Sequence, residues 1–254
     1  MKIIFLGTGP SHGVPVIGCN CDICISNDKK NNRWRSSILI EKKSRFLLVD
    51  TSPEFRFQAL TYNINKIDTV LFTHRHADHV HGFDDLRRFN EIMGKSIPCY
   101  ANEITAQSII NMYPYVFKAR TNDYTSKPKV TMNVIGKKPF KIERTKVQPV
   151  PIFHGKEKIL GYRIDDFAYL TDCSRIPQES YSLLNNLKVL VIGALRYTYH
   201  PNHLSVDEVI PVIEKIGPKK AYLTHMTHGI EYNSLNEYLP DYIEPAYDGL
   251  TIEI

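Results

Sequence analysis

The sequence has no apolar run near the roughly 20 residues that a membrane-spanning helix needs. It also has no internal repeat, no low-complexity tract and no Gly/Ser linker. Residues 1–7 form a short apolar run that lacks the long hydrophobic region and cleavage site of a secretory signal. We therefore expect a cytoplasmic protein with no membrane partner.

Positively and negatively charged residues are nearly balanced. The chain has 32 Lys and Arg against 27 Asp and Glu, which gives a net charge of +5. This balance suits an anionic substrate, but it is too mild to indicate nucleic-acid binding.

Cysteines are few and odd in number, at five. Three of them, Cys19, Cys21 and Cys24, lie within six residues, which favours metal binding over a disulfide framework. Three thiolates suit a tetrahedral zinc site, but the neighbouring sequence supplies no fourth ligand. Reduced, unliganded cysteines are the alternative. Cys99 lies in a predicted strand and Cys173 beside the candidate ligand Asp172, and both are expected to be buried as small apolar side chains.

Short strand-like runs alternate with helical stretches along the whole chain. We predict strands at residues 2–6, 37–40, 46–49, 69–73, 97–100, 130–135, 147–153, 160–164, 167–171, 189–192 and 220–224, and a closing edge strand at 250–254. Helices are predicted at 83–93 and 103–112, and a third runs from the capping box of Ser205 and Glu208 to Gly217. The polar residues 118–129 are predicted to form a surface loop. Such a mixture predicts one α/β domain over residues 1–254.

The strongest feature is a cluster of three histidines and an aspartate, His74, His76, Asp78 and His79. The spacing of His74 and His76 does not fit the i, i+4 pair of a helical zinc site, but it fits a loop that leaves a strand. Sites in layered α/β folds gather where strands end.

Three more candidate ligands follow predicted strands: His154, Asp172 and His225. The seven side chains divide into two sets of three with one carboxylate left to bridge, which is typical of a two-metal hydrolytic site. Imidazole and carboxylate suit Zn, Mn or Fe, so the residue types do not select the ion.

These motifs carry a family resemblance. The spacing His74-x-His76-x-Asp78-His79, followed by His154, Asp172 and His225, resembles the metallo-β-lactamase superfamily. A narrower similarity, to the PhnP-like branch of cyclic phosphate phosphodiesterases, is carried by Gly7-Thr8-Gly9, Gly18-Cys19-Asn20-Cys21-Asp22-Ile23-Cys24, Arg33-Trp34-Arg35-Ser36-Ser37, His200-Pro201-Asn202-His203 and Thr224-His225-Met226-Thr227-His228.

The resemblance implies a four-layer αββα sandwich, with two facing mixed sheets and outer helices. It implies a first metal on His74, His76 and His154, a second on Asp78, His79 and His225, and a bridging Asp172. It also makes His228 the fourth ligand of a structural zinc with Cys19, Cys21 and Cys24.

Two residues receive catalytic roles. By resemblance, His203 contacts the substrate and either steadies a phosphate oxygen or protonates the leaving group; on its sequence alone, it could be an exposed loop histidine. Asp78 is expected to orient the attacking water. Arg33, Arg35, Ser36 and Ser37 are expected to brace the site rather than bind phosphate, and no role is assigned to His12, His81 or His200.

The predicted function is hydrolysis of a small phosphodiester by a hydroxide that bridges two divalent ions, Mn or Zn. Cyclic phosphates of the ribose or 2′,3′-cyclic nucleotide type are the expected substrates. Alternatives are an RNA 3′-end processing endonuclease, a lactone or thioester hydrolase, and a metal-stabilised anion-binding scaffold without turnover. A nucleic-acid partner is not expected, and a homodimer is compatible with the sequence.

Overall fold

The computed structural model describes residues 1–117 and 126–254. Of the predicted loop at 118–129, residues 118–125 lie outside the described residues, and residues 126–129 have no regular structure. All elements named below belong to the described ranges.

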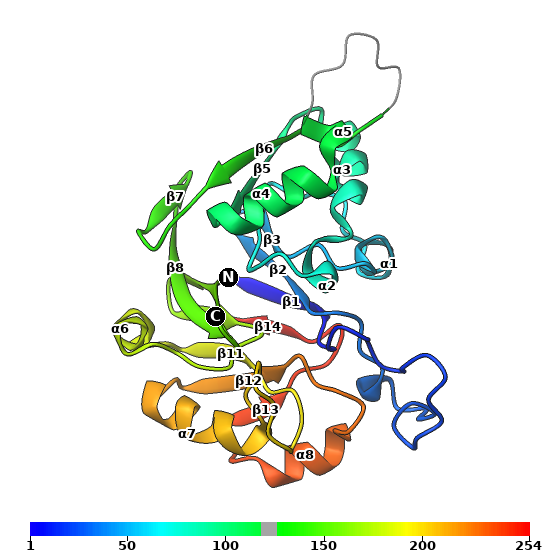
Figure 1. Ribbon diagram of the computed structural model, residues 1–254, viewed down its shortest axis with the longest axis vertical. Coiled ribbons are helices and arrows are strands. Elements are labelled where there is room, and N and C mark those ends of the chain that lie inside the picture. Colours follow the sequence, from blue (N-terminus) through cyan, green and yellow to red (C-terminus); the bar gives the residue numbers. More distant parts are fainter. Residues whose placement is uncertain (118–125) are drawn as a thin grey trace.

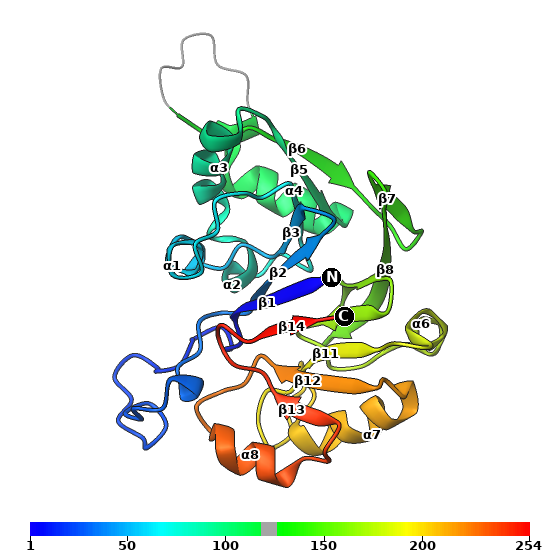
Figure 2. The ribbon, with the colours of Figure 1, turned by 180° about the vertical axis from the view of Figure 1, so that it is seen from behind.

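The described strands form two seven-stranded sheets. The first has the order β14-β1-β2-β3-β4-β5-β6, antiparallel from β14 to β3 and parallel from β3 to β6. Its strands are β1 (Lys2–Gly7), β2 (Ser37–Lys42), β3 (Arg45–Val49), β4 (Thr69–Leu71), β5 (Ile97–Ala101), β6 (Val130–Val134) and β14 (Thr251–Glu253). The last strand thus pairs with the first, and both termini lie in the middle of the molecule (Figure 2).

The second sheet has the order β13-β12-β11-β10-β9-β8-β7, parallel from β13 to β10 and antiparallel from β10 to β7. Its strands are β7 (Phe140–Ile142), β8 (Thr145–His154), β9 (Glu157–Ile164), β10 (Phe167–Leu170), β11 (Val189–Gly193), β12 (Lys220–Thr224) and β13 (Ile243–Pro245).

Helices cover the outer faces of both sheets (Figure 1). Those beside the first sheet are α1 (Phe55–Thr61), α2 (Ala77–Val80), α3 (Leu86–Met93), α4 (Glu103–Met112) and α5 (Pro114–Phe117). Those beside the second are α6 (Gln178–Tyr181), α7 (Val206–Ile216) and α8 (Tyr232–Tyr238). Short 3₁₀ turns occur at Lys29–Asn31, Phe83–Asp85 and Ser182–Leu184.

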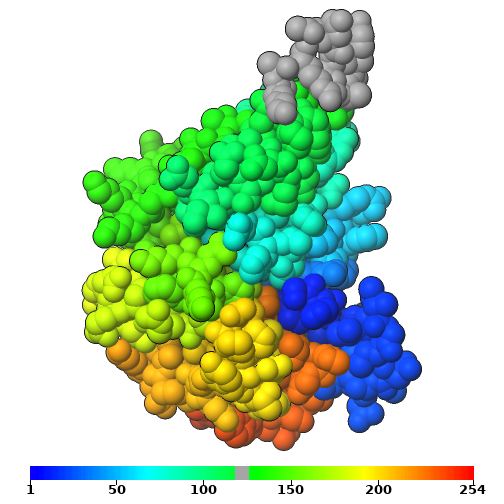
Figure 3. Space-filling model, viewed as in Figure 1, coloured from blue at the N-terminus to red at the C-terminus, as the bar shows by residue number. Residues whose placement is uncertain are grey.

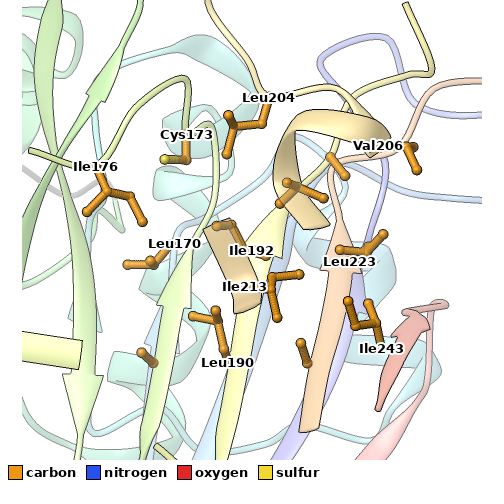
Figure 4. Packing of buried hydrophobic residues seen from close by; sticks show 14 of the residues in the cluster. Leu170, Cys173, Ile176, Leu190, Ile192, Leu204, Val206, Ile213, Leu223 and Ile243 are labelled. Carbon is orange, nitrogen blue, oxygen red and sulfur yellow. The ribbon is translucent and has the colours of Figure 1, made fainter. Parts of the chain in front are cut away.

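Three buried layers hold these elements together. Between the sheets, side chains such as Phe5, Val49 and Tyr169 interdigitate. A second layer packs the first sheet against its helices, and a third packs the second sheet against α7 and its neighbours, where Leu190 and Ile213 meet (Figure 4). Because both faces of the central strands are buried, strands such as β10 and β11 read as continuous apolar runs. The predicted αββα sandwich is confirmed.

Most predicted elements are confirmed, and the helix capped by Ser205 ends at Gly217 with both capping-box hydrogen bonds present. The strand predicted at 69–73 stops at Leu71, because the Thr73 N–H donates to the Asp50 carboxylate instead of a neighbouring strand. The helix predicted from Phe83 begins at Leu86, after a separate 3₁₀ turn. Strands β7 and β13 and five short helices, α1, α2, α5, α6 and α8, were not predicted.

Candidate functional site

Five strand or helix ends bring the seven predicted ligands together at one edge of the sandwich. His74 and His76 follow β4, Asp78 and His79 lie on α2, and the remaining three lie at the ends of β8, β10 and β12: His154, Asp172 and His225. All are buried except His76.

The chain turns sharply at the ends of three strands beside the cluster, β3, β10 and β12. Asp50, Asp172 and His225 have left-handed backbones, with φ of 64°, 54° and 61°. This conformation costs an L-residue about 1–2 kcal/mol, and such strain collects at functional sites. It ends the strand abruptly and turns each side chain into the common edge.

The ligand atoms form two groups. Those of His74, His76 and His154 lie within 4.8 Å of one another, as do those of the second group: Asp78, His79, Asp172 and His225. Asp172 faces both groups, because its Oδ2 is 3.8 Å from Nε2 of His74 and 3.2 Å from Nε2 of His225. Asp172 therefore lies between the two groups.

The second group fits a cation. Nε2 of His79 and Nε2 of His225 are buried and accept or donate no hydrogen bond. Nε2 of His79 instead lies 3.3 Å from a carboxylate oxygen of Asp78 and 3.3 Å from one of Asp172. Buried polar atoms without partners are costly, and a divalent ion between these nitrogens and carboxylates would satisfy them.

The charges around the site favour the same occupant. Burial lowers the pKa of His74 well below its usual range, which favours the neutral ring that a metal ligand needs. Burial opposes ionisation of Asp172, but His225 and His79 outweigh it and hold its pKa well below the usual value. Burial would lower the pKa of His79, but the negative charges of Asp172, Asp78 and Asp50 outweigh burial and raise this pKa well above its usual value. The carboxylates that attract a proton there would attract a metal ion.

Outer hydrogen bonds orient the ligands. Asp50, which the sequence analysis missed, accepts from the Thr73 N–H and from Nδ1 of His79, at 2.8 and 2.7 Å. Nδ1 of His154 donates to the Asn202 carbonyl at 2.9 Å. Such partners fix the tautomer of a ligating imidazole. Asp50 directly follows the apolar strand β3, and an aspartate at a strand end was the sequence signal that could have identified it.

The cysteine cluster also assembles. Nδ1 of His228 lies 3.3, 3.4 and 3.5 Å from the sulfurs of Cys19, Cys21 and Cys24. The four side chains therefore tie the N-terminal loop to the segment after β12. Cys99 and Cys173 are fully buried, as predicted.

Arg33 braces this junction. Its buried guanidinium donates to the carbonyls of Thr227 and Ile230 at 3.0 and 2.9 Å. Gly7 and Gly9 allow the first loop to pack closely against the backbone of residues 33–35, because a Cβ at Gly7 would lie 2.1 Å from the Arg35 carbonyl oxygen and one at Gly9 would lie 2.6 Å from the Arg33 carbonyl oxygen.

A pocket of about 700 Å³ opens beside the ligand cluster. The His203 ring lines it, stacked on the His225 ring at 4.9 Å and edge-on to the His154 ring at 4.6 Å between ring centroids. Burial and then His225 lower the pKa of His203 to about 3. The predicted substrate-contacting histidine therefore lies where the ligand cluster meets the pocket. His12 and His200 also line the pocket, whereas His81 is exposed at the end of α2.

No helix in the described ranges is long and apolar enough to cross a membrane.

Known proteins resemble this chain over its whole length. A family model described as a beta-lactamase superfamily domain matches residues 45–226. The crystal structure of a diphosphatase from the PhnP family has a TM-score of 0.93 and 38% identity, covering 100% of this chain and 97% of that one. Zn²⁺-bound PqqB from Methylobacterium extorquens has a TM-score of 0.81 over the full length of both chains but 18% identity, so it shows the fold alone.

One similar sequence carries a name that indicates a different activity from that of the PhnP-family diphosphatase. The octanoyltransferase of Porphyromonas gingivalis is 39% identical over 98% of this chain, but the match covers 51% of that protein. The chain therefore spans about half the length of this relative.

Proposed function

The chain belongs to the metallo-β-lactamase superfamily, in its PhnP-like branch, and on that basis we propose that it is a metal-dependent phosphodiesterase. Its expected substrates are small phosphodiesters, with ribose cyclic phosphates and 2′,3′-cyclic nucleotides first. The observation that carries the proposal is the seven-ligand cluster, with Asp172 between its two groups and His203 where the pocket begins.

We assign two divalent ions, Mn or Zn, to this cluster. His74, His76 and His154 would hold one and Asp78, His79 and His225 the other, with Asp172 shared. When bound, such ions polarise phosphoryl oxygens and lower the pKa of a coordinated water to about 7. A zinc ion on Cys19, Cys21, Cys24 and His228 would have a structural role.

The protein's own groups then position the reaction. Asp78 can accept a hydrogen bond from the attacking water and orient it. The water oxygen forms a bond to phosphorus as the ester P–O bond breaks, and the leaving oxygen gains a proton. The N–H of His203 can steady a phosphoryl oxygen or supply that proton. In a cyclic ester the ring opens, and the product remains one molecule.

The test is hydrolysis of bis(p-nitrophenyl) phosphate by protein loaded with Mn²⁺ or Zn²⁺, beside an Asp172→Ala variant. We expect turnover by the wild type and its loss, with loss of metal, in the variant. Asp165→Ala is the matched control, because Asp165 is an exposed aspartate that also has a positive φ. Metal content and turnover both unchanged in Asp172→Ala would refute the proposal.

Carbonyl-ester or thioester hydrolysis is the second candidate, favoured by the octanoyltransferase name of one relative. Among the described residues no cysteine lines the pocket: Cys99 and Cys173 are buried, and the other three surround His228. An acyl group would therefore pass directly to water rather than to a thiol. Faster turnover of p-nitrophenyl octanoate than of the phosphodiester would favour this candidate.

A further inference from the structure

The turn at residues 200–203 connects the pocket to the ligand cluster. It belongs to the loop between β11 and α7, which Figure 3 shows in yellow at the molecular surface. The His203 N–H donates to the His200 carbonyl at 3.4 Å, and the next residue, Leu204, donates to the Cys173 carbonyl at 2.7 Å. Because Cys173 follows Asp172, the turn is anchored to the strand end that carries the central carboxylate.

The backbone of Asn202 serves two histidines at once. Its carbonyl accepts a hydrogen bond from Nδ1 of His154 at 2.9 Å, and its N–H donates to Nδ1 of His200 at 3.2 Å. His154 is thereby held with Nδ1 protonated and Nε2 free for a cation. His200 is held in the opposite tautomer, because a nitrogen that accepts a hydrogen bond carries no proton. The proton of a neutral His200 must then be on Nε2.

A glycine makes this close approach possible. Gly155, which follows His154, has φ of +58°, and a Cβ there would lie 2.3 Å from Oδ1 of Asn202. Because residue 155 is a glycine, the turn can pack closely against the end of β8; a residue with a Cβ at this position would push the turn away.

The His200 side chain lies beside His203 in the pocket next to the ligand cluster. Its ring is 5.1 Å from the His203 ring, and both line the same pocket. Within residues 1–117 and 126–254, Nε2 of His200 has no hydrogen-bond partner. The described pocket lining contains five histidines and Arg196 but no carboxylate. The guanidinium of Arg196 donates to the carbonyls of Thr198 and Tyr199, which shapes the chain leading to His200.

We propose that His200 is a second substrate-contacting residue, whose Nε2–H donates a hydrogen bond to an anionic oxygen of the bound phosphoester. This inference rests on the proposed function, since it names a recognition residue of the same site. A neutral donor suits this position, because it binds an anion without adding positive charge beside two metal ions. Asn202 sets the tautomer that makes His200 a donor.

The first test measures binding of inorganic phosphate to the metal-loaded protein by isothermal titration calorimetry. A hydrogen bond to a charged group predicts a loss of about tenfold or more in phosphate affinity for His200→Ala. His200→Gln should restore most of it, because the glutamine amide nitrogen lies near the position of imidazole Nε2. His200→Asn should not, because its nitrogen lies near the position of Nδ1.

Controls separate recognition from folding. Tyr199→Ala alters an exposed neighbour outside the pocket lining and should bind phosphate as the wild type does. Metal content and melting temperature should match the wild type in every variant. In ¹⁵N NMR spectra, His200 should show a protonated Nε2 and an unprotonated Nδ1.

Phosphate affinity of His200→Ala within twofold of the wild type would overturn the inference, as would a protonated Nδ1 in the neutral ring. In phosphodiester hydrolysis we expect a KM raised about tenfold with a smaller change in kcat. A wild type that binds phosphate through His200 but hydrolyses no diester would refute the proposed function and support this inference. A wild type that neither binds phosphate nor hydrolyses the diester would overturn both.

Discussion

Replacing Asp50 by asparagine should weaken metal binding without removing any metal ligand. The buried carboxylate accepts hydrogen bonds from Thr73 N–H, Thr73 Oγ1 and Nδ1 of His79, at 2.8, 2.8 and 2.7 Å. Asparagine has nearly the same shape, but one of its two polar atoms is an NH₂ group that only donates. If the amide oxygen stays on the Thr73 N–H, the NH₂ faces Nδ1 of His79.

The expected loss of metal affinity follows from this replacement of an acceptor by a donor opposite Nδ1 of His79. With a donor opposite Nδ1, the favoured neutral His79 carries its proton on Nε2, the atom that lies 3.3 Å from Asp172 and Asp78. A protonated Nε2 cannot ligate a cation. Loss of such an outer partner typically costs 10–100-fold in metal affinity or activity, or about 1.4–2.8 kcal/mol.

The assay is metal affinity measured in a buffered Zn²⁺ series, with metal per chain determined by mass spectrometry. Asp165→Asn is the control, because this exposed aspartate pairs with Lys42 far from the cluster. We also expect ¹⁵N NMR spectra to show the proton of His79 on Nε2 in the apo variant. An Asp50→Asn protein whose zinc affinity stays within twofold of the wild type would refute the reasoning.

Three further predictions concern other parts of the chain. Leu190→Ala should lower the free energy of unfolding by about 2–5 kcal/mol, because the side chain is fully buried beneath α7. A decrease of less than about 1 kcal/mol in urea-unfolding experiments would contradict this packing. Burial would raise the pKa of Glu231, but hydrogen bonds from Asn31 and Ser234 outweigh it and lower the pKa to about 2. The stabilisation by Glu231 is therefore complete above about pH 4.5 and is lost as the pH falls toward 2. Glu231→Ala should lower the free energy of unfolding by about 0.5–2 kcal/mol at pH 7 and by less at pH 3. An equal loss at both pH values would be inconsistent with this pKa. Cys21→Ser should lower zinc content by one ion per chain; unchanged zinc would show that the cysteine cluster binds none.

Local patterns in the sequence predicted most elements and indicated a metal site. Apolar runs of strand length predicted most strands, and the Ser205 capping box located α7. Both signals are local, since alternation and capping depend on residues a few positions apart. The cluster from His74 to His79 indicated a metal site because so many polar rings in six residues cannot be buried without a common partner.

Which distant residues meet depends on how the strands and loops pack in three dimensions. Asp50 lies 29 positions before His79, and Asn202 lies 48 after His154, so no periodicity links them. Their contacts depend on where neighbouring strands end and on left-handed turns at those ends. Asn202 acts through its backbone, which any residue but proline would supply in full. The orientation of a ligand is therefore set by contacts that no local pattern records, although the residue types of the ligands themselves can be read from the chain.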